Sequence, residues 1–149
     1  PFQIRLGISG PATNLIDVGY GVSQVLPLLV SAFLGEGSKV YLYQQPEVHL
    51  HPRAQAELAT LFGFLVSRTQ KQIIVETHSD YIVDRLRMDI RDKTEGGISK
   101  DDVLILFFAR ADHEVKIHPI RIDEEGNLIG APSSYREFFS KEEQRLLGL

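Results

Sequence analysis

The residues best suited to chemistry follow a short apolar strand predicted at 40–43. The loop after this strand contains Gln44, Gln45, Glu47, His49 and His51. Amide and carboxylate side chains at the end of a strand are held at a fixed point, where they can face a phosphate, a magnesium ion or an attacking water. Glutamine can orient a water molecule, but it cannot act as a general base at neutral pH.

The two histidines of this loop are two residues apart, so an extended backbone would point both side chains to one side. That spacing permits metal binding, which needs at least a third ligand. The alternative is that Glu47, His49 and His51 only fasten the loop through hydrogen bonds to the backbone. For the two histidines, the loop by itself favours this second interpretation.

A second polar segment, Glu76-Thr77-His78-Ser79-Asp80, ends the next apolar strand and begins a helix. A histidine at this position is placed to contact a γ-phosphate or to hold a water, and its charge changes near neutral pH. Considered singly, a solvated histidine beside a helix N-cap is the simpler interpretation.

A third segment, Gly19-Tyr20-Gly21-Val22-Ser23-Gln24, stands directly ahead of a predicted helix. Glycines let the backbone approach a ligand closely, and the free N–H groups and dipole of a helix start favour an anion. These six residues fit a tight loop that feeds an ordinary helix equally well.

The elements that position these segments follow from apolar periodicity and helix signals. We expect a first helix from an N-cap at Ser23 to about Gly35, with Pro27 in its first turns. A strand at 40–43 and a helix at 53–68 that starts beside Pro52 should follow. A strand at 72–77 then leads to a helix that is capped by Ser79 or Asp80 and reaches about Ile90. Both strands are apolar enough to be buried on both faces. The order strand, loop, helix occurs twice in succession, which predicts an α/β fold with a parallel-strand core and flanking helices. Ligands gather at the carboxyl ends of such strands, where both polar loops begin.

The rest of the chain has β and turn patterns around this core. Residues 2–8 alternate as a strand, 103–109 and 115–122 form a predicted β-hairpin, 123–127 a turn, and 135–147 one or two short helices that stop at Gly148. Pro119 would place the second hairpin strand at a sheet edge.

Composition excludes several function classes. A chain of 149 residues with 43% hydrophobic and 24% charged residues predicts one soluble globular domain, and a net charge of −4 argues against a nucleic-acid footprint over the whole chain. The absence of cysteine excludes disulfides, thiolate metal sites and cysteine nucleophiles. No apolar run reaches the ~18 residues of a membrane span, and no leader pattern begins at Pro1, so we expect a cytoplasmic protein. The phosphate-binding pattern G-x-x-x-x-G-K-[ST] does not occur.

Taken together and in this order, the three segments resemble the carboxyl-terminal lobe of ABC-type ATPases, in the SMC-like and OLD-like prokaryotic branch of AAA-type ATP-binding proteins. VGYGVSQVLPLL is similar to the signature segment, VYLYQQPEVHLHP to Walker B with its D-loop, and QIIVETHSDYIVDRL to the switch-histidine segment. The resemblance runs from about Asn14 to Arg87, and more loosely onward. LFFAR and IRIDEEGNLIG are similar to a C-terminal extension of this branch, about 101–149. The resemblance implies that 1–149 is a single partial domain.

The resemblance implies a role for each matched residue. The signature residues that close on the γ-phosphate of ATP held by a partner subunit would be Gly21, Val22, Ser23 and Gln24. Gln44 would take the Walker B acid position near Mg²⁺ and hold the metal weakly. The catalytic residues would be Gln45, at the carboxylate position, the switch histidine His78, and Glu47. The segment 47–51 would form the D-loop across the dimer interface, with His51 beside the nucleotide.

The resemblance also implies partners. ABC-type heads dimerise head to tail, so two ATP molecules are shared between two P-loops and two signatures. An N-terminal half or a separate subunit would supply the P-loop, and ATP would hold a homodimer or higher oligomer together. The clamped state would control an effector such as a nuclease or toxin in antiviral defence. Arg85, Arg87 and Arg91 suggest a local basic face for DNA or a partner, although a solvated helix face is the simpler interpretation.

Two departures from the family pattern matter for catalysis. Most ABC-type Walker B strands end in two acids, whereas this chain has Gln44 and Gln45. Without a carboxylate at the second position there is no obvious general base, so we expect slow or absent hydrolysis. Without one at the first position the hold on Mg²⁺ is weaker. Glu47 or Glu76 could replace the missing carboxylate. The absent P-loop further predicts no ATPase activity from these residues alone.

Three functions remain open from the sequence. The first is the C-terminal part of an ABC-type ATPase head that completes a composite ATP site with a P-loop half. The second is a catalytically degenerate ATP-sensing scaffold that assembles without hydrolysis. The third is a metal-dependent hydrolase that would use His49, His51 and His78 with Glu47 or Asp80, although the H-E-x-x-H spacing is absent.

Overall fold

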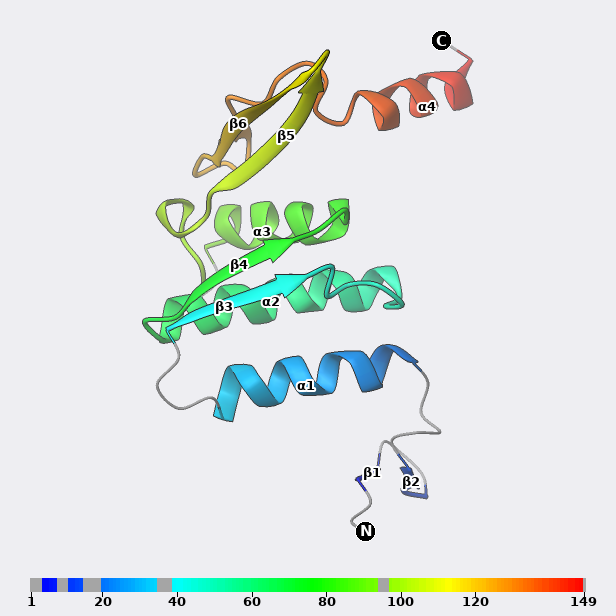
Figure 1. The fold of residues 1–149 in the computed structure, drawn as a ribbon, viewed down its shortest axis with the longest axis vertical. Coiled ribbons are helices and arrows are strands. Elements are labelled where there is room, and N and C mark those ends of the chain that lie inside the picture. Colours follow the sequence, from blue (N-terminus) through cyan, green and yellow to red (C-terminus); the bar gives the residue numbers. More distant parts are fainter. Residues whose placement is uncertain (1–3, 8–10, 15–19, 35–38, 94–96, 149) are drawn as a thin grey trace. The chain divides into compact units, whose positions relative to one another are not determined.

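The computed structural model describes residues 4–7, 11–14, 20–34, 39–93 and 97–148, in two compact units, Pro1–Leu86 and Arg87–Leu149. The elements of the first unit are β1 (Arg5–Leu6), β2 (Thr13–Asn14), α1 (Tyr20–Leu34), β3 (Val40–Gln44), α2 (Pro52–Arg68), β4 (Gln72–Glu76) and the first part of α3 (Asp80–Arg91) (Figure 1). The second unit contains the end of α3, a short 3-10 helix (Lys100–Asp102), β5 (Ile105–Ala111), β6 (Glu114–Ile122), β7 (Leu128–Ile129) and α4 (Glu137–Leu147).

The predicted parallel α/β core is confirmed. β3 and β4 pair in parallel from Val40 opposite Gln72 to Gln44 opposite Glu76, and α2 is the crossover between them. Helix α2 begins at Pro52, which suits the first helical position because its missing N–H would have no partner there. Both polar loops therefore leave the same edge of the sheet.

One face of this sheet packs against helices. The core contains Leu28 of α1 and Leu58 and Phe62 of α2, which pack with Tyr43, Ile73 and Val75 of the two strands. The Tyr43 ring stacks on Phe62 with 5.6 Å between ring centroids. Burial of these side chains is the main stabilising contribution to the unit.

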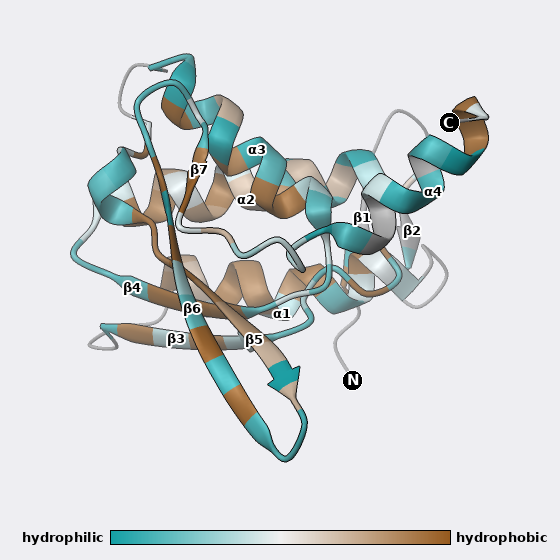
Figure 2. Cartoon of the chain, turned by 90° about the horizontal axis from the view of Figure 1, so that it is seen from above, coloured by the Kyte–Doolittle hydropathy of each residue, from teal (hydrophilic) through white to brown (hydrophobic). Residues whose placement is uncertain are grey.

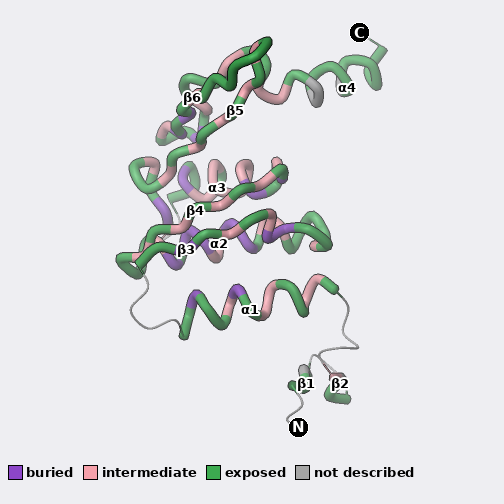
Figure 3. Tube along the Cα trace, in the orientation of Figure 1, coloured by how far each residue is buried: buried purple, intermediate pink, exposed green. Residues whose placement is uncertain are grey.

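The other face of the sheet is exposed, so the prediction that both strands are buried on both faces is wrong (Figure 3). Leu42 is 72% exposed, and Val40 and Ile74 are each about half exposed. Side chains alternate along a strand, and the core contacts use the face of Tyr43, Ile73 and Val75. The intervening apolar residues therefore point away from the core.

Helix α1 differs from its predicted boundaries. It starts at Tyr20, and Ser23 lies inside it with its Oγ donating to the Tyr20 carbonyl at 2.9 Å, so the predicted N-cap at Ser23 is wrong. A serine hydroxyl can bond back to a preceding carbonyl of its own helix, so a serine near a helix start need not be its N-cap. Pro27 consequently lies in the helix interior, not in the first turns, and cannot donate to the Ser23 carbonyl four residues earlier.

The predicted cap of α3 agrees with the structure, whereas the first predicted strand is shorter than expected. Ser79 Oγ accepts from the N–H of Ile82 at 3.3 Å, which identifies Ser79 as the residue that caps α3. Of the strand predicted at 2–8, residues 5 and 6 form β1, which pairs with β2 in antiparallel fashion, and residues 2, 3 and 8 lie outside the described part.

The second unit contains the predicted hairpin in a three-stranded antiparallel sheet, β5-β6-β7. The strands meet at a tighter turn than predicted, because Asp112 adopts a left-handed conformation with φ of 51° and β5 continues to Ala111. β6 pairs on both sides and is not an edge strand. Its pairing with β7 covers only Arg121 and Ile122, so Pro119 lies beyond it. The predicted C-terminal helix is single, and Gly148 ends it with φ of 72°.

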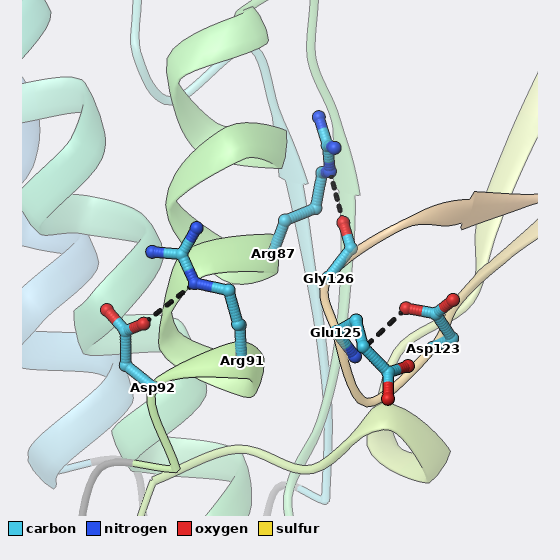
Figure 4. Close-up of polar contacts among 6 residues, drawn as sticks. All are labelled: Arg87, Arg91, Asp92, Asp123, Glu125 and Gly126. Carbon is cyan, nitrogen blue, oxygen red and sulfur yellow. Dashed lines mark hydrogen bonds and ion pairs between the residues drawn. The ribbon is translucent and has the colours of Figure 1, made fainter.

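The predicted turn at 123–127 is tied to α3 (Figure 4). Asp123 accepts from the backbone N–H of Asn127 at 2.7 Å and of Glu125 at 3.0 Å, and Arg87 Nε donates to the Gly126 carbonyl at 2.7 Å. The Asn127 backbone hydrogen bond is the main reason why the pKa of Asp123 lies below its ordinary value. A Cβ on Gly126 would lie 2.8 Å from the Arg87 carbonyl oxygen, so this close approach requires glycine.

Among the described helices, none combines the length and the apolar character that crossing a membrane requires.

Candidate functional site

The polar loops of the first unit start from neighbouring strand ends. Gln44 and Glu76 are register partners at the ends of β3 and β4, and both are exposed on the sheet face that α1 and α2 leave open. The backbone N–H of Gln45 donates to the Glu76 carbonyl at 2.8 Å. The strand pairing thus continues one residue into the loop and fixes where the loop begins.

The loop at 45–51 contains two residues whose backbone adopts the left-handed conformation. Gln45 has φ of 44° and His49 has φ of 68°, conformations that are uncommon for residues other than glycine. Internal hydrogen bonds hold them: Val48 N donates to the Gln45 carbonyl at 3.2 Å, and Leu50 N to the Glu47 carbonyl at 3.0 Å. Unfavourable backbone of this kind persists only where the surroundings fix it, and it concentrates at functional sites.

This backbone separates the two histidines of the loop. His51 Nδ1 accepts from the N–H of Arg53 at 3.3 Å and caps α2, whereas the His49 ring lies edge-on to the Tyr20 ring with 5.2 Å between centroids. Neither arrangement is the extended one that would direct both rings to one side. No three His, Cys, Asp or Glu side chains of the described chain are grouped to hold a metal, so the hydrolase alternative built on His49, His51 and His78 lacks support.

Glu47 connects this loop to the loop that follows β4. Its side chain is buried, with 6% of the residue exposed, and Oε1 accepts from Thr77 Oγ1 at 2.6 Å and from the His78 backbone N–H at 3.0 Å. Oε2 is also buried and has no hydrogen-bond partner among the described residues. A carboxylate enclosed in this way positions its neighbours and is not open to an attacking water.

A second connection runs parallel to the first. Ser79 Oγ donates to Gln55 Oε1 at 2.6 Å, and Gln55 Nε2 donates to the Leu50 carbonyl at 2.9 Å. Thr77 Oγ1 additionally accepts from the Ser79 N–H at 3.0 Å. The loops at 45–51 and 77–79 are therefore fastened to each other at two points.

The start of α1 packs against the same loop. A Cβ on Gly21 would lie 3.1 Å from the His49 carbonyl oxygen and 3.1 Å from Leu50 Cδ2, so glycine permits this contact. Gly21, Val22, Ser23 and Gln24 lie in the first turns of α1 rather than in a loop ahead of it. The first two are half-buried, while Ser23 and Gln24 are exposed.

The predicted site residues therefore meet in one region but differ in access. Exposed side chains belong to Ser23, Gln24, Gln44, His51 and His78. Gln45 is half-buried, and Glu47 is closed off from solvent. Sequence reasoning missed Thr77 and Gln55 as members of the network. Thr77 stands next to the switch candidate His78, which was a usable signal, whereas nothing in the spacing of Gln55 pointed to Ser79.

The arginines suspected of forming a basic face all have partners within the chain. Arg85 Nη1 donates to Thr60 Oγ1 at 3.4 Å and lies 3.8 Å from a Glu57 oxygen. Arg87 contacts the Gly126 carbonyl, and Arg91 pairs with Asp92 at 2.8 Å (Figure 4). These contacts within the chain weaken the interpretation of the three arginines as a basic face for DNA or a partner.

Known proteins resemble this chain in both sequence and fold. The family described as AAA ATPase domain matches residues 2–83, more than half of the chain. The OLD nuclease of Thermus scotoductus is 26% identical over 108 residues, which are 70% of this chain and 20% of that protein, so the chain spans about a fifth of the curated relative. A solved structure from a study of ATP-driven dimerization and DNA-stimulated activation of SMC ATPases matches with a TM-score of 0.57 and 14% identity, over 91% of this chain and 68% of the other. The fold is that of a P-loop NTPase lobe, and the chain belongs to the AAA ATPase domain family.

Proposed function

We propose that this chain is the signature–Walker B–switch part of an ABC-type ATPase head, which completes a composite ATP site with a P-loop half and a dimer partner. The observation that carries the proposal is the fastening of three segments at one edge of the parallel sheet. Glu47 joins the loop at 45–51 to Thr77 and His78, and Gly21 brings the start of α1 against the same loop. A site shared between subunits needs such rigidity, because catalytic and binding groups act only when they are held in place.

The exposed residues of the region have the chemistry that a nucleotide requires. Ser23 and Gln24 present a hydroxyl and an amide in the first turns of α1, where the helix dipole favours an anion. His78 is exposed while its own backbone N–H is held by Glu47, so the imidazole is carried on a fixed backbone. We infer that these groups face the γ-phosphate of an ATP bound by the partner's P-loop.

The same edge offers oxygen ligands for Mg²⁺. Gln44 supplies an amide oxygen and Glu76, its register partner, a carboxylate on the same exposed face. One carboxylate combined with substrate phosphates and waters is a common coordination for Mg²⁺, which when bound neutralises phosphate charge. We therefore favour Glu76 over the enclosed Glu47 as the residue that substitutes for the missing Walker B acid.

A catalytically degenerate scaffold is the second candidate, and the position of Glu47 favours it. Gln45 cannot act as a base, and the nearest carboxylate in the loop has one oxygen engaged twice and the other out of contact with solvent. On this hypothesis ATP holds two heads together and leaves slowly. The names of the OLD nuclease and of the SMC ATPases suggest that the clamped state controls a nuclease or another effector, with nucleic acid as a partner.

The experiment combines the chain with the P-loop half and measures dimerisation and phosphate release separately. ATP-dependent dimerisation, by sedimentation velocity with Mg²⁺, is expected in both cases. Phosphate release that His78→Ala abolishes supports the ATPase, whereas dimerisation without release supports the scaffold. A mixture that neither dimerises nor hydrolyses ATP contradicts both. The isolated chain is expected to release no phosphate, and measurable turnover by it would refute the shared-site proposal.

A further inference from the structure

The sheet of the second unit has an exposed apolar face, which we call the hairpin face. Its apolar residues, which follow one side of the three strands, are Leu106, Phe108, Val115, Ile117, Pro119 and Ile129. The exposed fractions of the two β5 residues and of Val115 and Ile117 lie between 50% and 63%. Figure 2 shows the hydrophobic residues recurring along β5 and β6.

This face is unusual because the packed part of the opposite face is also apolar, while Glu114, Lys116 and His118 lie on that opposite side toward the hairpin turn. There, Ile120 and Ile122 are buried, and the Phe107 ring lies edge-on to Tyr135 with 5.2 Å between centroids. An antiparallel sheet with one packed face normally carries polar residues on the other. The hairpin face offers on the order of 500 Å² of apolar surface, which is at the upper end for the largest patch on a monomer and typical of an interaction surface.

The charges of the hairpin face restrict what can cover it. Arg110 and Arg121 lie on the same side of the sheet, at its two ends, and the described strands place no acidic residue on that side. Two hairpin faces pressed together would bring arginines near one another without compensation, which disfavours that pairing. The complementary partner is an apolar stripe that carries acidic residues.

The described part of helix α4 combines acidic residues with an exposed apolar end. Leu146 is 87% and Leu147 is 71% exposed, and Figure 2 shows this hydrophobic end of α4 next to a mainly hydrophilic stretch. The same helix carries Glu137 and Glu142, which pair with Lys141 and Arg145 in half-exposed contacts on the helix itself. Such surface pairs contribute little and exchange readily for others.

We propose that α4 of a second copy of this chain docks on the hairpin face, and that the exchange is reciprocal. A reciprocal exchange gives a closed twofold dimer and not an open filament. Two docked helices together would bury on the order of 2,000 Å² in total, which is within the range of stable protein interfaces. This dimer needs no nucleotide and does not depend on the ATP-dependent clamp proposed above, so the two proposals fail in different experiments.

The test measures the mass of the 149-residue chain by sedimentation equilibrium in the absence of nucleotide. The protein concentration is varied from about 1 to about 100 µM, the range in which such interfaces form. The wild-type chain is expected to dimerise. Ile117→Asp on the hairpin face, and the double variant Leu146→Asp/Leu147→Asp on α4, are each expected to weaken dimerisation at least tenfold. Val30→Asp is the matched control, because it places the same charge at an exposed apolar residue of α1.

Mixing the two variants distinguishes the exchange from other dimers. The α4 variant retains an intact hairpin face and Ile117→Asp retains an intact α4, so one of the two docked contacts is restored in the mixture. We therefore expect heterodimers in the mixture where each variant alone is monomeric. A monomeric wild-type chain at the highest concentration, an unaffected Ile117→Asp dimer, or a mixture without heterodimers would each overturn the proposal. Circular dichroism of each variant excludes unfolding as the cause.

Discussion

Replacing Glu47 provides the most informative test of how the candidate site is held together. Glu47→Ala removes the acceptor of two hydrogen bonds, from Thr77 Oγ1 and from the His78 N–H. A buried donor left without a partner costs about 1–3 kcal/mol. Removal of a buried carboxylate oxygen that has no partner among the described residues returns part of that cost. We expect the free energy of unfolding to fall by about 2–3 kcal/mol, which for a chain of this size lowers the Tm by about 5–10 °C.

Glu47→Gln separates hydrogen bonding from charge. The amide oxygen of glutamine can accept both hydrogen bonds in the position of Oε1, while the negative charge is lost. The glutamine amide nitrogen takes the place of the unpartnered Oε2, and the cost of its unpartnered donors is offset by removal of the buried charge. We therefore expect the unfolding free energy to stay within about 1 kcal/mol of wild type. Glu57→Ala is a suitable control, because it removes an exposed carboxylate whose 3.8 Å contact with Arg85 contributes about 0.5 kcal/mol or less.

The assay is urea unfolding followed by circular dichroism, with amide hydrogen exchange as a local measurement. The His78 N–H is expected to be protected in wild type and in Glu47→Gln, and to exchange rapidly in Glu47→Ala. The reasoning is refuted if Glu47→Ala changes stability by less than 0.5 kcal/mol, about the error of the method. Equal destabilisation by both variants would also refute it, since the charge and not the two hydrogen bonds would then carry the effect.

Three further predictions concern the loop, the metal and the turn. Gly21→Ala should destabilise the chain by about 1 kcal/mol in urea unfolding, although alanine is the better helix former. The reason is that its Cβ would lie 3.1 Å from the His49 carbonyl oxygen. A gain in stability would show that the loop moves to make room for the Cβ. Glu76→Gln should weaken Mn²⁺ binding to the ATP-loaded complex about tenfold by electron paramagnetic resonance, with Glu125→Gln as an exposed control, and equal binding would remove Glu76 as a ligand. The folded-state pKa of Asp123 lies below its ordinary value of 3.8, so its stabilising contribution is complete above that value and is lost as the pH falls through the folded-state pKa. The Tm difference between wild type and Asp123→Ala should therefore shrink below pH 4, about the ordinary pKa of the group, and a difference independent of pH would contradict this assignment.

Much of the fold could be predicted because its determinants are local. The apolar stripe of α2, the Ser79 cap of α3 and the hairpin turn near Asp112 each depend on a few neighbouring residues. Helix α1 shows the limit of such reasoning. Ser23 has the chemistry of an N-cap, but the same hydroxyl can bond to the Tyr20 carbonyl from inside a helix, and the local sequence does not decide between the two.

The burial of β3 and β4 could not be predicted for a different reason. An apolar strand indicates that both of its faces favour burial, but not which segment covers them. Leu42 and Ile74 are on the face that α1 and α2 do not cover, and the sequence has no local signal for that. The hairpin face is a second case, since apolar residues lie on both sides of β5 and on the exposed side of β6, and this pattern does not show which face lies toward the core.

Within the candidate site, the types of residue were predictable but their roles were not. The spacing of His49 and His51 suggested a shared direction, which the left-handed backbone of His49 prevents. Glu47 has the residue type of a substitute base, but it is buried and one of its oxygens accepts two hydrogen bonds. Such distinctions depend on contacts between residues about thirty positions apart, and no pattern within one loop contains them.

The distribution of carboxylates bears on what the proposed ATP site does. The two positions at the end of β3 are neutral glutamines, and the carboxylate of the loop is retained where it fastens one loop to the other. General base chemistry requires a carboxylate in contact with water, while mechanical coupling requires one that is enclosed and hydrogen-bonded. This chain has an enclosed, hydrogen-bonded carboxylate at Glu47 and no carboxylate at Gln45, the position expected for a general base. On the proposed function, closure of two heads around ATP is therefore preserved while hydrolysis is slowed, so the clamped state should outlast that of a head with acids at both positions.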